Sequence, residues 1–135
     1  MPTFTKPSLD ADEAFEALRG LAHATRSTED PREIYSALGS LASGLACLEQ
    51  VLHQLARFHD GPARDRTWMT GDARTARAAS YQVSWELHRA AEMVRQVAAG
   101  LDRAHEIEGT MVYEVRDFPT PVHGGRATPE PSVSL

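Results

Sequence analysis

Two histidines within long helical patterns are the side chains best placed to bind a metal or exchange a proton near neutral pH. His53 and His88 each have a glutamate one helical turn away, Glu49 and Glu92 respectively. A metal centre requires such side chains to converge. If the helices that contain the two histidines pair antiparallel, so that facing residue numbers sum to about 131, the histidines lie about 15 Å apart along the helix axes. The sequence therefore predicts no metal site and no bound cofactor.

The other reactive side chains do not form a recognisable site either. His23 and His105 are expected to meet Glu33 and Glu108 at one end of the helices, in a solvated acidic cluster. Cys47 is the single cysteine and has no cationic neighbour at helical spacing, so a buried, unreactive thiol is expected. Nothing resembles a catalytic triad, and we predict no catalytic residue and no enzymatic activity.

The element that must position these side chains is a heptad seam between residues 30 and 62. Asp30, Pro31 and Glu33 form a strong helix start, and Gly61 before Pro62 forms the stop, with Gly61 expected in a left-handed conformation. A helix is predicted over about 31–59. Its apolar residues alternate at spacings of four and three: Ile34, Leu38, Leu41, Leu45, Leu48, Leu52 and Leu55.

A second helix with the same spacing is predicted over about 72–108, so the two should form a long antiparallel hairpin. A short helix at about 9–25, starting at Ser8 or Asp10, should pack on the hairpin and cover the seam only from Ile34 to Leu45. The predicted fold is an all-α three-helix bundle that dimerises into a larger bundle. The apolar positions of the second helix are Ala76, Ser80, Val83, Leu87, Ala90, Val94, Val97, Leu101 and Ala104.

A lane of small residues runs beside the leucine seam: Ala37, Ser40, Gly44 and Cys47. Glycine inside a helix costs about 1 kcal/mol relative to alanine, so close approach of another helix should offset it. We expect Phe15 and Leu18 of the first helix to fill this lane.

The domain organisation is a single helical unit with extensions at both ends. Residues 1–8 are expected to be flexible, 9–109 to form the bundle, and 110–118 to form a loosely packed extension. Residues 119–135 are rich in Pro, Gly and Ser with few apolar groups, which predicts a disordered tail.

The loop end of the hairpin is the predicted interaction surface, because the short helix cannot reach it and aromatic side chains gather there. A symmetric homodimer is the simplest way to cover such a surface, and a different protein partner is the other possibility. The function predicted is that of a non-enzymatic adaptor or accessory protein. The predicted interface residues are Val51, Leu52, Leu55, Phe58, Trp68, Tyr81 and Trp85.

Nucleic-acid binding is an alternative, because the same end is locally basic and contains a tryptophan that could stack on a base. The net charge of −5 argues against a whole surface that binds nucleic acid. The candidate phosphate contacts are Arg57, Arg64, Arg66, Arg74 and Arg77.

Two short motifs give a partial resemblance to the WXG100 proteins. Trp68-Met69-Thr70-Gly71 lies in the predicted loop, and Tyr113 is followed four residues later by Asp117. The family has Trp-x-Gly in its bend and Tyr-x-x-x-Asp/Glu after its second helix. The first motif departs by one residue, the loop is longer than the family's bend, and an extra helix precedes the hairpin. The resemblance implies a helical hairpin exported by type VII secretion, and we keep it as a further alternative.

The composition is that of an ordinary globular protein, with 41% hydrophobic and 24% charged residues. No apolar run approaches the roughly 18 residues of a membrane span, and no signal peptide is recognisable at the N-terminus. We expect a cytoplasmic protein that does not bind membranes. Thirteen of the fourteen basic residues are arginine and alanine is abundant, which suggests a bacterial genome rich in GC.

Overall fold

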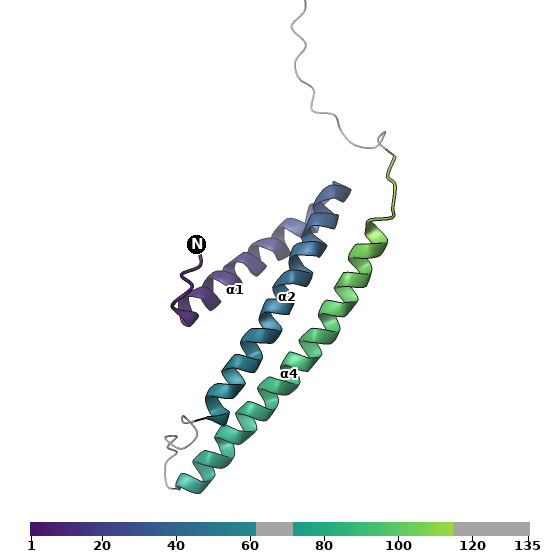
Figure 1. Ribbon diagram of the computed structural model, residues 1–135. Coiled ribbons are helices and arrows are strands. Elements are labelled where there is room, and N and C mark those ends of the chain that lie inside the picture. Colours follow the sequence, from purple (N-terminus) through teal and green to yellow (C-terminus); the bar gives the residue numbers. More distant parts are fainter. Residues whose placement is uncertain (62–71, 115–135) are drawn as a thin grey trace, which may run out of the picture.

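The computed structural model describes residues 1–61 and 72–114, which are helical except for short connections and ends. Its elements are α1 (Pro7–Ala24), a 3₁₀ turn η1 (Thr25–Ser27), α2 (Pro31–Asp60) and α4 (Ala73–Glu108), as Figure 1 shows. The prediction of an all-α chain with three helices is confirmed, with bounds that differ by at most two residues. Residues 110–114 have no regular secondary structure, and the expected loop at 62–71 and tail at 119–135 lie outside the described residues.

The two long helices begin at the capping residues that the sequence indicates. Asp30 and Asp72 each accept a hydrogen bond of 2.9 Å from a backbone N–H two residues later, at Arg32 and Arg74. Gly61 does not adopt the expected left-handed conformation. Its φ is −100°, and its N–H donates to the Arg57 carbonyl at 3.1 Å before the chain leaves in an extended direction.

The first helix begins at Pro7 rather than at Ser8 or Asp10. Asp10 is used differently, because its carboxylate accepts backbone N–H groups of Thr3 at 2.6 Å and Phe4 at 3.1 Å. The hydrogen bond from Thr3 is the main reason why the pKa of Asp10 is lowered. The residues before α1 therefore fold back as a hook onto Asp10, while the N-cap residue Lys6 makes no side-chain hydrogen bond to the start of the helix.

Helices α2 and α4 form the antiparallel hairpin, but small side chains and not leucines line the centre of their contact (Figure 1). Leu48 and Leu55 of the predicted seam are 41% and 48% exposed. Alanine and serine allow two helix backbones to approach closely, so this stripe is used and the leucines stay at the edge. In the described part of the chain no large side chain is fully buried, and the buried residues are Ala42, Ala56, Ala76, Ser80, Ser84, Ala91 and Ala98.

The register of the hairpin differs from the predicted one. His59 Nδ1 lies 2.9 Å from Ser80 Oγ, so facing residue numbers sum to 139 (59 and 80) and not to 131. Helix α4 consequently begins beyond the end of α2, as the lower end of Figure 1 shows. This shift brings His53 and His88 together, and the predicted separation of about 15 Å between them is wrong.

Helix α1 does not pack on the hairpin as predicted. Within the described residues, no Cα atom of α1 lies within 8 Å of one in α2 or α4. Phe15 and Leu18 are 63% and 56% exposed, so they do not fill the small-residue lane. The chain turns away because η1 and the extended Thr28 (ψ 121°) separate the two helix axes. Figure 1 shows α1 and α2 diverging below the elbow that joins them.

Two glycines of α2 provide a matched test of this packing. An added Cβ at Gly39 would lie 3.0 Å from His105 Nε2, whereas at Gly44 it would meet nothing within 4 Å. His105 is held against Tyr35, with ring centroids 4.2 Å apart, so it has little room to yield. We expect Gly44→Ala to stabilise the chain by about 1 kcal/mol and Gly39→Ala to destabilise it by about 1–2 kcal/mol.

Urea unfolding followed by circular dichroism measures both effects. Equal stabilisation by the two substitutions would contradict the close approach of His105 to α2.

Candidate functional site

The predicted interface residues on α2 lie together on one exposed side. Val51, Leu55 and Phe58 are spaced by four and three residues and are 44%, 48% and 63% exposed. Leu52 is half-buried at the edge of the hairpin contact. Trp68 lies outside the described residues.

The predicted interface residues on α4 lie on a different side of the hairpin. Tyr81 and Trp85 each follow a buried serine and are one helical turn apart, 63% and 53% exposed. Trp85 stacks under the guanidinium of Arg89, which is 5.4 Å from its ring, and His88 is one turn along the same side. Among the described residues, the structure therefore does not bring Phe58 into one patch with Tyr81 and Trp85.

The register places the apolar residues of both helices along one edge of the hairpin. Leu52 directly precedes His53 and Leu87 directly precedes His88, and successive residues on a helix point about 100° apart. Because the two histidines meet at one edge of the contact, the two leucines lie at the other. Repeating the sum of 139 along the helices sets Leu45 opposite Val94.

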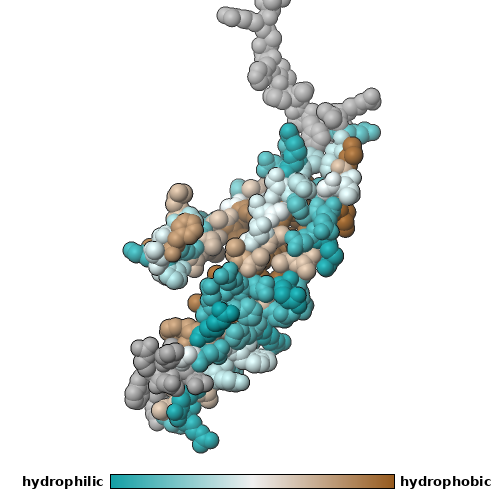
Figure 2. Space-filling model, viewed as in Figure 1, coloured by the Kyte–Doolittle hydropathy of each residue, from teal (hydrophilic) through white to brown (hydrophobic). Residues whose placement is uncertain are grey.

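We call this surface the leucine face. On α2 it contains Ile34, Leu38, Leu41, Leu45, Leu48, Val51, Leu52, Leu55 and Phe58, and on α4 Val83, Leu87, Val94, Val97 and Leu101. In Figure 2 the visible lower face of the hairpin is mostly hydrophilic, and hydrophobic atoms appear where α1 and the hairpin separate. The elbow between them encloses a hollow of about 320 Å³, whose lining includes Leu21, Ile34, Leu38 and Leu41.

The opposite edge of the hairpin carries a connected set of polar contacts, which we call the histidine clasp. His53 Nδ1 lies 2.7 Å from His88 Nδ1, and His88 Nε2 lies 3.0 Å from Asp60 Oδ2. Ser84 donates its hydroxyl to the other oxygen of Asp60. Only one arrangement of neutral rings satisfies every contact: His53 Nδ1–H donates to His88, and His88 Nε2–H donates to Asp60.

Charged side chains surround the clasp. Glu49 Oε1 lies 4.0 Å from His53 Nε2, beyond hydrogen-bond distance. Glu92 pairs with Arg95, and this hydrogen bond is the main reason why the pKa of Glu92 is lowered. In the described part of the chain, no three His, Cys, Asp or Glu side chains are arranged to hold a metal. The clasp therefore links α2 to α4.

Sequence reasoning missed the clasp because it depends on the register. Each histidine lies next to a seam leucine, and this position at the seam edge was the available signal. The other predicted histidine cluster does not form as expected, because His105 stacks on Tyr35 under Gly39. Cys47 is exposed and not buried, because the small-residue lane faces away from α4 and α1 does not cover it.

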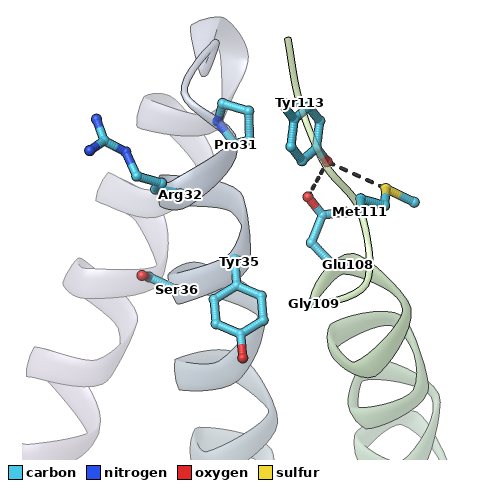
Figure 3. Close-up of a pocket in the computed structure, with 8 residues that line it drawn as sticks. All are labelled: Pro31, Arg32, Tyr35, Ser36, Glu108, Gly109, Met111 and Tyr113. Carbon is cyan, nitrogen blue, oxygen red and sulfur yellow. Dashed lines mark hydrogen bonds between the residues drawn. The ribbon is translucent and has the colours of Figure 1, made fainter. Parts of the chain in front are cut away.

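A second hollow, of about 310 Å³, lies where the N-terminus of α2 meets the C-terminus of α4 (Figure 3). Pro31, Tyr35, Met111 and Tyr113 supply its apolar and aromatic walls. Tyr113 donates its hydroxyl to Glu108, and Figure 3 shows this contact closing one side. The hydrogen bond anchors the residues that follow α4.

This anchor has a predictable pH dependence, because the hydrogen bond to Glu108 raises the pKa of Tyr113. The contribution of the contact is fully present below the ordinary tyrosine pKa of about 10 and is lost as the pH rises through the higher folded value. We expect Glu108→Gln to move the tyrosinate absorbance titration to lower pH. The same substitution should have no such effect in a Tyr113→Phe chain, and an equal shift there would exclude Tyr113 as the group responsible.

The predicted phosphate contacts are only partly described. Arg57, Arg74 and Arg77 are exposed near the loop end of the hairpin, while Arg64 and Arg66 lie outside the described residues. Among residues 1–61 and 72–114, no helix combines the length and apolar character that crossing a bilayer requires.

The fold and surface define a helical protein built on an antiparallel hairpin, with one apolar edge and one polar edge. Comparison with protein-family models, with curated proteins and with solved structures finds no match for this chain.

Proposed function

We propose that this protein is a non-enzymatic helical interaction protein that self-associates through its leucine face. The observation that carries the proposal is the exposure of large apolar side chains on a well-formed hairpin whose buried residues are all alanine or serine. Phe58 is 63% exposed and Val97 is 54% exposed, and a row of leucines lies between them on the same face. Such a continuous apolar surface is typical of an interface.

A second copy of the chain is the occupant that these features favour. The seven most exposed residues of the leucine face present about 600 Å² per copy, so two copies would bury about 1,200 Å², the lower end for a specific complex. The face also has a heptad spacing along both helices, which matches the spacing of an identical face. Two hairpins opposed about a two-fold axis would form a four-helix bundle with leucines in its core.

Multi-angle light scattering coupled to size exclusion tests the proposal. At micromolar concentration we expect a mass of twice 14.8 kDa for the purified chain. A mass of 14.8 kDa over the same range would contradict self-association. A dimer that forms equally well when the leucine face is altered would contradict the assigned surface.

The nucleic-acid alternative remains a proposal supported by the exposed Arg57, Arg74 and Arg77. Binding through these residues would weaken steeply with salt concentration, because each phosphate contact releases counterions. Fluorescence anisotropy with a labelled DNA duplex at two salt concentrations distinguishes this alternative. Binding that does not depend on salt would exclude it.

A further inference from the structure

We propose that α1 is an exchanged arm, which packs on the hairpin of a second copy rather than on its own. The inference rests on the proposed self-association and adds the element that completes it. In the dimer, each α1 would lie along the leucine face of the other copy's α2, beside the line where the two leucine faces meet. Figure 1 shows that α1 diverges from its own α2 below the elbow, so its own hairpin does not cover its apolar side.

The first argument is that α1 is a formed helix with an unused apolar side. Phe15 and Leu18 are 63% and 56% exposed, and no residue of α1 is buried. The chain before the helix is held by hydrogen bonds from the Thr3 and Phe4 N–H groups to the Asp10 carboxylate, and at the other end the Thr25 N–H donates to the carbonyls of Leu21 and His23. An amphipathic helix that is formed but uncovered favours a partner for its apolar side.

The second argument is length. Helix α1 has 18 residues and spans about 27 Å, while the part of α2 from Leu41 to Phe58 spans about 26 Å. The arm therefore matches the uncovered stretch of a partner hairpin. On its own hairpin the arm lies apart from this stretch, since η1 and the extended Thr28 turn it away at the elbow.

The third argument is buried area. The hairpin faces alone reach only the lower end of the range for a specific dimer. Adding Phe15 and Leu18 from both copies raises the estimate to about 1,700 Å², close to the standard interface of about 1,600 Å². With α1 included, the estimated buried area is therefore that of a standard specific dimer.

Cross-linking of two distinguishable copies tests the exchange, with the exposed Cys47 as the native anchor on α2. One tagged copy carries Ala14→Cys and Cys47→Ser, and the untagged copy keeps only Cys47. After the copies are mixed and treated with a short bismaleimide, we expect a tagged–untagged product on a denaturing gel. The negative control is a mixture in which each copy carries Cys47→Ser and neither carries Ala14→Cys.

A chain with both Ala14→Cys and the native Cys47 supplies the opposing measurement. Products at the dimer mass support exchange, and products only at the monomer mass would overturn it in favour of α1 folding back on its own hairpin. Absence of any cross-link to α1 would overturn it as well. Light scattering on the same samples separates the two proposals. A dimer without inter-copy cross-links would contradict only the exchange of α1, whereas a monomer would contradict self-association itself.

Discussion

The chain carrying both Leu48→Glu and Leu55→Glu should be a folded monomer at concentrations where the native chain is a dimer. In the single chain these side chains are 41% and 48% exposed, so their replacement removes little packing within the hairpin. At the proposed interface each buried leucine contributes about 2 kcal/mol, and symmetry counts each one twice. The new carboxylates also repel one another across the interface. We therefore expect Kd to rise by at least about a thousandfold.

The matched control is Gln50→Glu, which adds a negative charge to the same helix at an exposed position on the side of His53 and Arg57, away from the leucine face. Sedimentation equilibrium should give a dimer for the control and a monomer for the double variant. Circular dichroism should give the same helix content for all three chains. A double variant that remains dimeric would move the interface away from the leucine face, and Tyr81 and Trp85 on the other edge would then be the residues to replace.

The helix bounds were predictable because local chemistry decides them. Asp30 before Pro31 and Asp72 before α4 cap the helices with their own side chains, whatever the rest of the chain does. The position of α1 was not predictable from periodicity. Its apolar spacing predicts that one side of the helix is covered, but the spacing is the same whether the covering surface belongs to the same chain or to another one.

The centre of the hairpin contact was mispredicted for a related reason. Helix α2 carries a stripe of leucines and, on the side that faces α4, the small residues Ala42 and Ala56, which are fourteen residues apart with Glu49 midway between them. The small residues allow close backbone approach, and the leucine stripe offers more apolar area. One pair of helices cannot centre its contact on both. The hairpin uses the small residues, and the leucines remain for a wider contact.

The register could not be read from the apolar pattern either. Sliding one helix by a heptad would set Leu45 opposite Leu87 instead of opposite Val94, which still pairs apolar side chains. The alanine layers are shallow and resist such a slip weakly. The contacts that discriminate are specific ones, namely His53 with His88, Asp60 with Ser84, and His105 against Gly39.

Removing the histidine clasp should therefore weaken the hairpin and loosen its register. His88 is the central member, because it contacts both His53 and Asp60. We expect His88→Ala to lower the free energy of unfolding by about 2 kcal/mol and His53→Ala by about 1 kcal/mol. The double variant should cost less than the sum, because the two side chains share one hydrogen bond. Equal and additive effects would contradict the series of hydrogen bonds from His53 to His88 and from His88 to Asp60.

The register itself can be followed with disulfides in a Cys47→Ser chain. The native register sets position 42 opposite position 98, and a slip of one heptad would set it opposite position 91. All three positions are occupied by buried alanines. With the clasp intact, Ala42→Cys should form a disulfide with Ala98→Cys and not with Ala91→Cys. Without His53 and His88, the 42–91 disulfide should also form, since the leucine and alanine layers accept both registers. If only the 42–98 disulfide forms in the chain without the clasp, the apolar layers alone determine the register.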